Sequence, residues 1–502
     1  MENPVLNPDQ AGRQINSNFK TFKIKIMNMF KIKLMKICLF ILMSASLAFG
    51  QNGHSEKIDE LLSMLHNQQQ FNGSIIIAEK GKITFKKSYG AANQETNRTV
   101  DENTVFELAS VSKQFTAMGI VILKERGKLS YDDKLTKFFP ELEEYKNVSI
   151  RNLLNHTSGI PDYINPTSLS SFDPTKINKN QDVINYLIKN KIKLDFEPNT
   201  KFAYSNTGYV LLASIIEKVS GKSFGDFLHK SIFKPLKMNN TFVYMRRLAP
   251  RKIDNYAFGY AFSYEKNKYT LPDEMAKFVV FLDGIVGDGN ISSTAMDMLK
   301  WDRALRAEKL ISKESLKEIY TPAVLSDKTP TKYGFGWFIE NNKDYGDFVW
   351  HSGSFPGYKT YIGRHLTNDK TIIILQNYND VVLPSSNIAE IVYDKPMTKI
   401  YRKQINIDAE ILAKYIGEYK DKADEKNTIT LTKGDNCIIY NSSTKHKDWD
   451  LKLFPESNNY FFAKVTNIQI EFATTESGEI TLKLYQSGKL IGEGVKIKQP
   501  VK

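Results

Sequence analysis

The chain has 502 residues, of which 69 are lysine or arginine and 56 are aspartate or glutamate, so its formal net charge is +13. Hydrophobic residues make up 41% of the sequence and charged residues 25%; both fractions exclude a disordered, collagen-like or polytopic membrane chain. Two cysteines are too few for a disulfide-rich scaffold or a metal site of several thiolates. The length predicts two or three domains.

Residues 1–50 have the features of a leader that is removed. Seven basic residues and two acidic ones lie in this segment, and a basic stretch is followed by an uncharged run over 37–49. That run is shorter than the about 20 apolar residues that span a bilayer. The small residues Ala48 and Gly50 precede a possible cut before Gln51, as in a secretory signal peptide. We therefore expect an exported protein, periplasmic or secreted; the alternatives are an uncleaved N-terminal anchor helix and a buried core helix.

The chain after the leader begins with a predicted helix and a predicted hairpin. Leucine and isoleucine recur at helical spacing over 56–68. Two β-rich runs follow, Ser74–Ala78 and Ile83–Lys87, with residues 79–82 between them. This arrangement predicts an antiparallel pair of strands.

The middle of the chain, from about 105 to 330, has a mostly helical pattern, with loops predicted at 160–180 and 235–255. Strands return after residue 345, and a helix is predicted near Asn387–Tyr393. The predicted strands are Phe348–His351, Thr360–Arg364 and Thr371–Gln376. Strands near both ends with helices between them predict one sheet closed by distant segments, with a largely helical region inserted in its middle.

The C-terminal region has a different pattern. Beyond a candidate linker at Lys399–Asn406, short β-type runs recur about every 10 residues with glycine or asparagine between them. These runs are Ile429–Leu431, Cys437–Tyr440, Leu451–Phe454, Tyr460–Val465, Ile468–Phe472 and Ile480–Tyr485. Their spacing predicts a small all-β sandwich or barrel.

A serine and a lysine at Ser-x-x-Lys spacing are the first candidates for chemistry. The motif is not rare in the chain and occurs, among other places, at Ser17–Lys20, Ser110–Lys113, Ser231–Lys234 and Ser442–Lys445. Only Ser110 opens a long helical segment, predicted from Val111 to Glu125, and residues three apart share one helical face. A desolvated lysine loses its proton more easily, which could activate a hydroxyl without a histidine. The alternative is an N-capping serine with a surface lysine.

Two further motifs follow in the chain. Tyr204 and Asn206 lie in a predicted turn before a helical run, where a phenol could act as a base if Lys113 stabilises its anion; the alternative is a packed tyrosine with a turn asparagine. His351 and Gly353 form the one His-x-Gly of the sequence. A glycine there lets substrate backbone approach a strand edge, and the alternative for His351 is a structural histidine.

In this order, the three motifs resemble the serine β-lactamase and penicillin-binding-protein superfamily, in particular its class C-like branch of DD-carboxypeptidases, D-aminopeptidases and esterases. Further phrases match, at Phe106–Lys113, Leu153–Pro161, Gly287–Gly289, Ser292–Thr294 and Tyr333–Trp337. The resemblance covers 55–395, and Tyr415–Tyr419 resembles the start of the lipocalin-like barrel that often follows this domain. We therefore expect a leader at 1–50, a hydrolase domain at 51–398 and a β-barrel domain at 405–502.

The resemblance implies an α+β fold, with a β-lactamase/transpeptidase-like antiparallel sheet flanked by helices. It also implies an acyl-enzyme on Ser110, proton transfer by Lys113 and Tyr204, and an oxyanion hole from the backbone N–H groups of Ser110 and Ser354. Substrate binding would involve Asn206, His351, Gly353 and Ser354. No metal or organic cofactor is implied.

The function expected from this resemblance is that of an exported DD-carboxypeptidase or D-amino-acid peptidase. The alternatives are a carboxylesterase, a weak β-lactamase, or a non-catalytic penicillin-binding or envelope scaffold protein. His351 stands where dedicated β-lactamases usually carry lysine, so strong antibiotic hydrolysis is not expected. The expected partners are small-molecule or peptide substrates (D-amino-acid peptides, esters or β-lactams), with no nucleic acid and no strong membrane association after signal cleavage.

Overall fold

The computed structural model describes residues 53–497, apart from 264, 267, 274, 380, 399–400, 424–426, 443–445, 467 and 487. The chain forms two compact units, residues 1–59 and 60–502. The predicted leader and signal peptide at 1–50 and the first two residues of the candidate linker lie outside the described residues. Residues 53–67 are helical, and no helix in the described part is long and apolar enough to cross a membrane.

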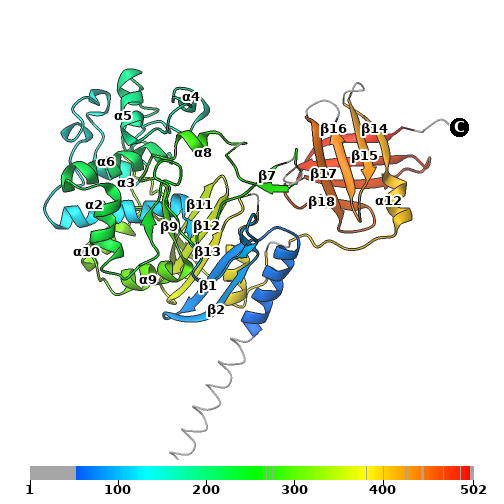
Figure 1. The fold of residues 1–502 in the computed structure, drawn as a ribbon, viewed down its shortest axis with the longest axis horizontal. Helices are drawn as coiled ribbons and strands as arrows, with labels where there is room; N and C mark the ends of the chain where they lie inside the picture. Colours follow the sequence, from blue (N-terminus) through cyan, green and yellow to red (C-terminus); the bar gives the residue numbers. More distant parts are fainter. Residues whose placement is uncertain are drawn as a thin grey trace, which may run out of the picture. The chain divides into compact units, whose positions relative to one another are not determined.

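A six-stranded antiparallel sheet forms the centre of the larger, N-terminal part of the second unit (Figure 1). Its strand order is β10-β11-β12-β13-β1-β2. The strands are β1 (Gly73–Glu79), β2 (Lys82–Tyr89), β10 (Phe338–Asn342), β11 (Gly346–Phe355), β12 (Tyr358–His365) and β13 (Lys370–Gln376). Gly73 pairs with Gln376 and Glu79 with Lys370. The prediction of one sheet closed by distant segments is therefore confirmed.

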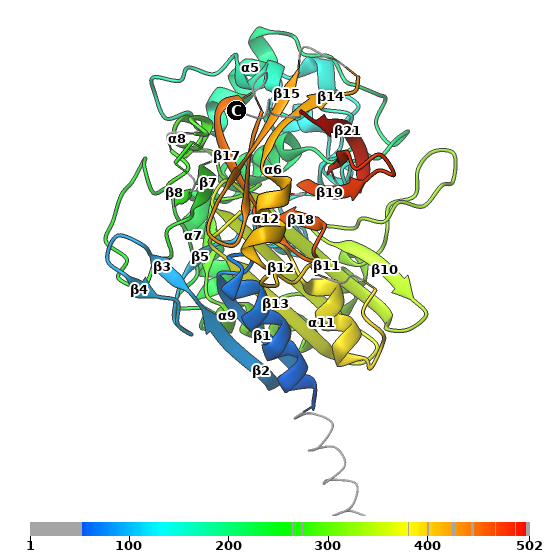
Figure 2. The same cartoon turned by 90° about the vertical axis from the view of Figure 1, so that its right-hand side faces the viewer.

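The hairpin of β1 and β2 follows from its turn and its burial. Lys80 and Gly81 both have positive φ, 50° and 76°, as in the type I′ turns that match the twist of paired strands. Three consecutive isoleucines of β1, Ile75–Ile77, are buried, as expected for a strand with both faces covered. Two helices, α9 (Ala295–Arg306) and α11 (Ser385–Val392), lie on opposite faces of the sheet (Figures 1 and 2).

The region between β2 and β10 is mostly helical, as predicted. Its helices are α2 (Lys113–Glu125), α3 (Ile150–Leu154), α4 (Pro166–Leu169), α5 (Asn180–Lys189), α6 (Asn206–Ser220), α7 (Phe224–Leu228), α8 (Phe278–Phe281) and α10 (Lys313–Ile319). Short 3-10 turns occur at η1 (Ala109–Ser112), η2 (Leu135–Lys137) and η3 (Glu143–Tyr145), and η4 (His229–Phe233) is a π-helix. The short helix α4 falls within the predicted loop 160–180.

Three small sheets complete this region. The first consists of β5 (Phe106–Glu107), β9 (Ile291–Ser293) and β6 (Phe242–Val243). It pairs the strand that leads to Ser110 with a strand from later in the region. The other two are β3 (Ala91–Asn93) with β4 (Arg98–Thr99), and β7 (Ala261–Ser263) with β8 (Lys268–Thr270). Because β5 ends three residues before Ser110, its pairing with β9 fixes the approach to that serine.

The C-terminal region is a closed barrel of eight strands in sequence order, preceded by α12 (Ala409–Tyr415). The strands are β14 (Gly417–Asp421), β15 (Thr428–Lys433), β16 (Ile438–Ser442), β17 (His446–Pro455), β18 (Tyr460–Ala463), β19 (Ile468–Thr474), β20 (Ile480–Gln486) and β21 (Lys489–Lys496). All six predicted runs are strands. The barrel closes through β14 and β21, which pair with each other and were not predicted.

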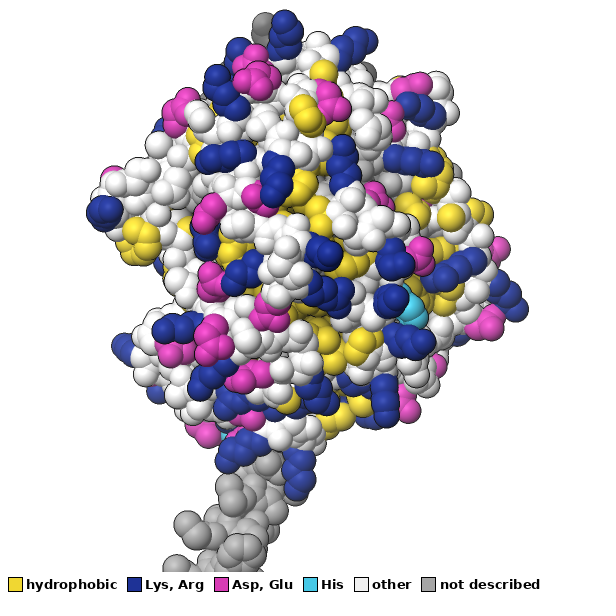
Figure 3. Space-filling view, turned by 90° about the vertical axis from the view of Figure 1, so that its left-hand side faces the viewer, with side chains coloured by type: hydrophobic (Ala, Val, Ile, Leu, Met, Phe, Trp, Pro, Cys, Tyr) yellow, Lys and Arg dark blue, Asp and Glu magenta, His cyan; other side chains and the backbone are white. Residues whose placement is uncertain are grey.

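The surface carries charges of both signs. On the face shown in Figure 3, lysine and arginine side chains outnumber acidic ones but are interspersed with them, and apolar side chains lie in the hollows between. On this face the basic side chains therefore do not form one continuous patch.

Candidate active site

Ser110 lies in a tight turn that begins with an unusual backbone conformation. The turn η1 starts at Ala109, which has a φ of +48°, a left-handed conformation that costs a non-glycine residue roughly 1–2 kcal/mol. The α-helix begins at Lys113, two residues later than predicted, because residues 109–112 form a 3-10 turn. Ser110 therefore sits at the bend where β5 leads into the buried helix α2.

Gly353 on β11 makes room for this turn. A Cβ atom on Gly353 would lie 2.3 Å from the Leu108 carbonyl oxygen and 3.1 Å from the Ala109 Cβ. The same Leu108 carbonyl accepts a hydrogen bond from Thr360 Oγ1 at 2.7 Å. Gly353 therefore allows the chain next to Ser110 to rest on this face of the sheet.

Lys113 connects the predicted residues. Its Nζ donates hydrogen bonds to Ser110 Oγ at 3.1 Å, to Asn206 Oδ1 at 2.8 Å and to the Asp288 carbonyl at 2.9 Å. The side chain is 0% exposed. An ammonium group has three N–H donors, so these acceptors match all of them. The structure therefore brings Ser110, Lys113 and Asn206 into direct contact.

Asn206 is held in the orientation that this contact needs. It is the first residue of α6, after the extended N-cap residue Ser205. Its Nδ2 donates to Asp162 Oδ2 at 2.8 Å, so its carbonyl oxygen is the atom that faces Lys113. Asp162 had no predicted role, although it follows directly on the Leu153–Pro161 phrase.

Tyr204 lies beside Lys113 but is not hydrogen-bonded to it. The Lys113 Nζ is 4.9 Å from the centroid of the Tyr204 ring. The Tyr204 hydroxyl is buried and has no hydrogen-bond partner among the described residues. On its other side the ring packs against His156, with 4.2 Å between ring centroids and an interplanar angle of 34°. The phenol is thus fixed by packing, with its hydroxyl unpartnered.

His351 is enclosed in a hydrogen-bond network. Its Nδ1 donates to the Ser352 carbonyl at 2.6 Å, so its Nε2 accepts from the Tyr333 hydroxyl at 2.9 Å. Burial, together with the nearby Lys113 charge, lowers the pKa of His351 to about 3. The ring is therefore neutral, and its centroid is 6.2 Å from that of Tyr204.

A small cavity of about 80 Å³ opens at Ser110. Of the predicted residues, Ser110, Asn206 and Ser354 line it, whereas Lys113, Tyr204, His351 and Gly353 do not. Two acidic residues, Glu107 and Asp288, also line the cavity. The arrangement can present a serine hydroxyl to a carbonyl group bound in this cavity, with a buried cation behind the hydroxyl.

Sequence reasoning missed several residues at this site. Glu107, His156, Asp288 and Tyr333 all lie within phrases that match the family, but no motif assigns them a role. Burial raises the pKa of Glu107 to about 7, despite the opposing effect of Arg247. Burial also raises the pKa of Asp288 above its usual value. The sequence signal for these four residues is that they are polar and lie near the short motifs.

The sequence is similar to those of known proteins. The sequence profile of the beta-lactamase family matches residues 58–390. Penicillin-binding protein 4* of Bacillus subtilis (strain 168) is 39% identical over 441 residues, which are 86% of this chain and 96% of that protein.

Solved structures show the same fold. A penicillin-binding protein from Bacillus halodurans has a TM-score of 0.56 and 25% identity, and covers 66% of this chain and 97% of its own. The D-amino acid amidase of Ochrobactrum anthropi SV3, complexed with L-phenylalanine amide, has a TM-score of 0.53 and 24% identity, and covers 68% of this chain and 97% of its own.

Proposed function

This chain belongs to the beta-lactamase family of serine hydrolases, and from that premise we propose that it is an exported enzyme that cleaves D-amino-acid peptides, amides or esters through an acyl-enzyme on Ser110. The observation that carries the proposal is the contact of the buried Lys113 with both Ser110 and Asn206 at the cavity. All three N–H donors of the buried Lys113 ammonium are used in hydrogen bonds. The ammonium therefore places a fixed positive charge next to the hydroxyl of Ser110, a residue that lines the cavity.

The proposed reaction has two steps. Ser110 Oγ attacks the substrate carbonyl carbon, and its proton passes to Tyr204, whose ring centroid lies 4.9 Å from the Lys113 Nζ. The proton then moves to the departing amine or alcohol as its bond to the carbonyl carbon breaks. Water attacks the resulting ester on Ser110 and releases the acid, which restores the serine hydroxyl.

The negative charge that develops on the carbonyl oxygen needs donors. We assign this role to the backbone N–H groups of Ser110 and Ser354, because both residues line the cavity. Loss of one donor of this kind typically lowers kcat by about 10²–10³. In this scheme Gly353 acts indirectly, by letting the Ser110 turn approach the strand that carries Ser354.

Covalent labelling tests the assignment of the nucleophile. The Ser110→Ala variant should lose all labelling by a fluorescent penicillin or a fluorophosphonate, because in the described part of the chain no other serine contacts a buried lysine in this way. Ser231→Ala is the matched control, since Ser231 begins another Ser-x-x-Lys sequence, and it should be labelled like the wild type. Labelling of Ser110→Ala at another serine would refute the proposal.

A second variant tests the base. Tyr204→Phe keeps the ring that packs on His156 and removes only the hydroxyl, so acylation should slow by about 10²–10⁴ while the unfolding midpoint stays the same. Stopped-flow labelling measures the acylation rate. A near-wild-type rate would assign proton transfer to Lys113 alone.

The export part of the proposal rests on residues 1–50 of the sequence. N-terminal sequencing of the protein secreted by a bacterial host should give a chain that begins at Gln51. Ala48→Arg places a large charged residue at the predicted cleavage site and should leave the leader attached. A wild-type chain that keeps its leader and stays in the cytoplasm would contradict export.

A further inference from the structure

The cavity at Ser110 has an uneven charge. Glu107 and Asp288 line it, and none of its lining residues is a lysine, arginine or histidine. We propose that this cavity selects substrates that carry a protonated amino group next to the scissile carbonyl, so that the enzyme acts on D-aminoacyl amides, esters or peptides with a free amino end. The inference rests on the proposed acyl-enzyme mechanism and adds the charge of its substrate.

Glu107 is the side chain best placed to bind an ammonium group. It is the last residue of β5, where it pairs with Ser292 of β9, and it lies three residues before Ser110. Its carboxylate makes no hydrogen bond or ion pair with any other described residue. A partly buried carboxylate without a partner is costly, and an ammonium group from the substrate would supply the missing partner.

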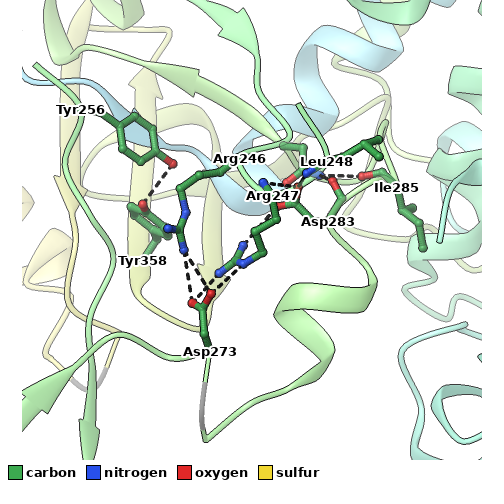
Figure 4. Close-up of polar contacts among 9 residues, drawn as sticks. Arg246, Arg247, Leu248, Tyr256, Asp273, Asp283, Ile285 and Tyr358 are labelled. Carbon is green, nitrogen blue, oxygen red and sulfur yellow. Dashed lines mark hydrogen bonds and ion pairs between the residues drawn. The ribbon is translucent and has the colours of Figure 1, made fainter. Parts of the chain in front are cut away.

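Two arginines lie close enough to Glu107 to influence its charge, but both are bound elsewhere. Arg247 forms ion pairs with Asp273 at 2.6 Å and with Asp283 at 3.1 Å, and Arg246 contacts Asp273 at 3.2 Å (Figure 4). Neither arginine lines the cavity. Their guanidinium groups are therefore committed to other carboxylates and are not placed to receive a carboxylate of the substrate.

Asp288 is the second acidic residue that lines the cavity. Its side chain is 8% exposed and accepts a hydrogen bond from the Tyr163 hydroxyl at 2.9 Å. Its backbone carbonyl is also one of the three acceptors of Lys113. The buried Lys113 thus does not line the cavity, whereas the two acidic residues Glu107 and Asp288 do.

Lys113, Arg246 and Arg247 are therefore all bound to other groups of the protein. The charged residues that line the cavity, Glu107 and Asp288, are both acidic. A substrate carboxylate would enter a cavity with no cation to receive it, and it would face the carboxyl groups of Glu107 and Asp288. An ammonium group would meet an acceptor of opposite charge. The difference in affinity should favour the amine, since hydrogen bonds to charged groups contribute roughly 1.5–3 kcal/mol.

A pair of chromogenic substrates tests the inference on the purified mature protein. D-alanyl-p-nitroanilide and N-acetyl-D-alanyl-p-nitroanilide differ in the charge and in the size of the amino end, so the change of their ratio on removal of a carboxylate isolates the effect of charge. The short side chain suits the small cavity. The wild type should have the higher kcat/KM for the free amine. In Glu107→Gln the ratio of the two kcat/KM values should fall by roughly 10- to 100-fold, and Asp288→Asn should shift it in the same direction.

The controls separate recognition from folding. Glu141→Gln changes an exposed glutamate of the same domain and should leave the ratio unchanged. An equal loss on both substrates in Glu107→Gln would mean that the residue is structural, and would overturn the inference. A wild type that prefers the acetylated substrate, or N-acetyl-D-alanyl-D-alanine with its free carboxylate, would overturn it as well.

The outcome for the proposed function can be read separately. Intact mass spectrometry after mixing shows whether Ser110 becomes acylated by any of these compounds. Acylation without preference for the free amine contradicts the charge selectivity but leaves the serine hydrolase in place. The absence of acylation by all of them and by penicillin contradicts both.

Discussion

Lys113 shows how single contacts keep a charge buried in this protein. Its ammonium group is 0% exposed, and three oxygens from three different segments accept its hydrogen bonds. Removing a partner from a buried charge typically costs about 3–5 kcal/mol. The same contacts that stabilise the lysine also fix the position of Ser110.

His156 is expected to position Tyr204. Its Nδ1 accepts a hydrogen bond from the Ser205 backbone N–H at 3.1 Å, and its ring stacks on Tyr204. His156→Phe keeps a ring but loses the acceptor, so kcat should fall by roughly tenfold with little change in KM. Steady-state kinetics on an ester substrate measures both values.

The matched variant is His156→Asn. Asparagine offers an oxygen acceptor and tolerates the φ of +59° found at this residue, so it should recover part of the lost kcat. A His156→Phe enzyme with wild-type kcat would show that the histidine only fills space.

The pH dependence of amine substrates should report on Glu107. Burial raises the pKa of its carboxyl to about 7, so the group is protonated below this pH and ionised above it. kcat/KM for D-alanyl-p-nitroanilide should therefore rise as the pH increases through about 7, and Glu107→Gln should lack this rise. The charged and titratable groups around Glu107 are Arg246, Arg247, Asp283, Asp288, Tyr256 and Tyr358.

The histidines at the site cannot produce the same rise. Burial and the Lys113 charge lower the pKa of His156 well below its usual value and that of His351 to about 3, so both rings stay neutral through the relevant range. A pH profile for the acetylated substrate provides the comparison. An identical rise for both substrates would assign the titration to another group.

At the scale of residues, the sequence pointed to residues that the structure brings into contact, but not to all the residues that line the cavity. The sequence indicated Ser110, Lys113 and Asn206 because they belong to short motifs. These motifs together are typical of a serine hydrolase. Glu107 and Asp288 were not indicated, because a glutamate or aspartate is ordinary in sequence. Only folding shows that β5 and the 287–289 segment place their carboxyl groups in one cavity.

At the scale of elements, the packing of η1 on β11 depends on Gly353. In Gly353→Ala the added methyl group would overlap the Leu108 carbonyl and Thr360 Oγ1, which lie 2.3 and 2.4 Å from its ideal position. Overpacking of this kind costs typically 1–3 kcal/mol, and here the atoms that must move lead to Ser110. Both the unfolding free energy and the rate of penicillin labelling should therefore fall.

A glycine in the barrel provides the control. Gly492→Ala adds the same methyl group to a strand, β21, where the nearest atom is 3.9 Å away, so stability and labelling should remain close to wild type. Denaturant titration and stopped-flow labelling compare the two variants. Wild-type labelling by Gly353→Ala would mean that the Ser110 turn can shift without loss of geometry.

The elements that sequence reasoning missed have weak hydrophobic patterns. β10 contains Glu340, Asn341 and Asn342 and forms one edge of the sheet. β14 is short and charged, and β21 carries two glycines. Such strands are held by their neighbours and not by their own side chains. The strongly alternating or apolar strands, by contrast, were predicted within a few residues.

At the scale of the whole molecule, the barrel has the features of an independent folding unit. Its eight strands leave no unpaired edge, and its core includes Tyr419, Leu453 and Phe461, all fully buried. Residues 405–502 expressed alone should therefore unfold cooperatively in guanidinium chloride, as followed by circular dichroism. Leu453→Ala should lower the unfolding free energy by about 2–5 kcal/mol.

The result that would contradict this prediction is a sloping, non-cooperative transition of the isolated segment, unaffected by Leu453→Ala. A family profile that ends at residue 390 is consistent with a boundary before the barrel.

The pairing of β1 with β13 has a consequence for biosynthesis. A chain emerging from the ribosome exposes Ser110 early, yet β11 and β13, on which the reactive turn depends, are translated only when residues 346–376 are made. Until then the nascent polypeptide contains Ser110 and Lys113 but lacks the strands on which the Ser110 turn packs. The arrangement around Ser110 should thus form abruptly and late in synthesis.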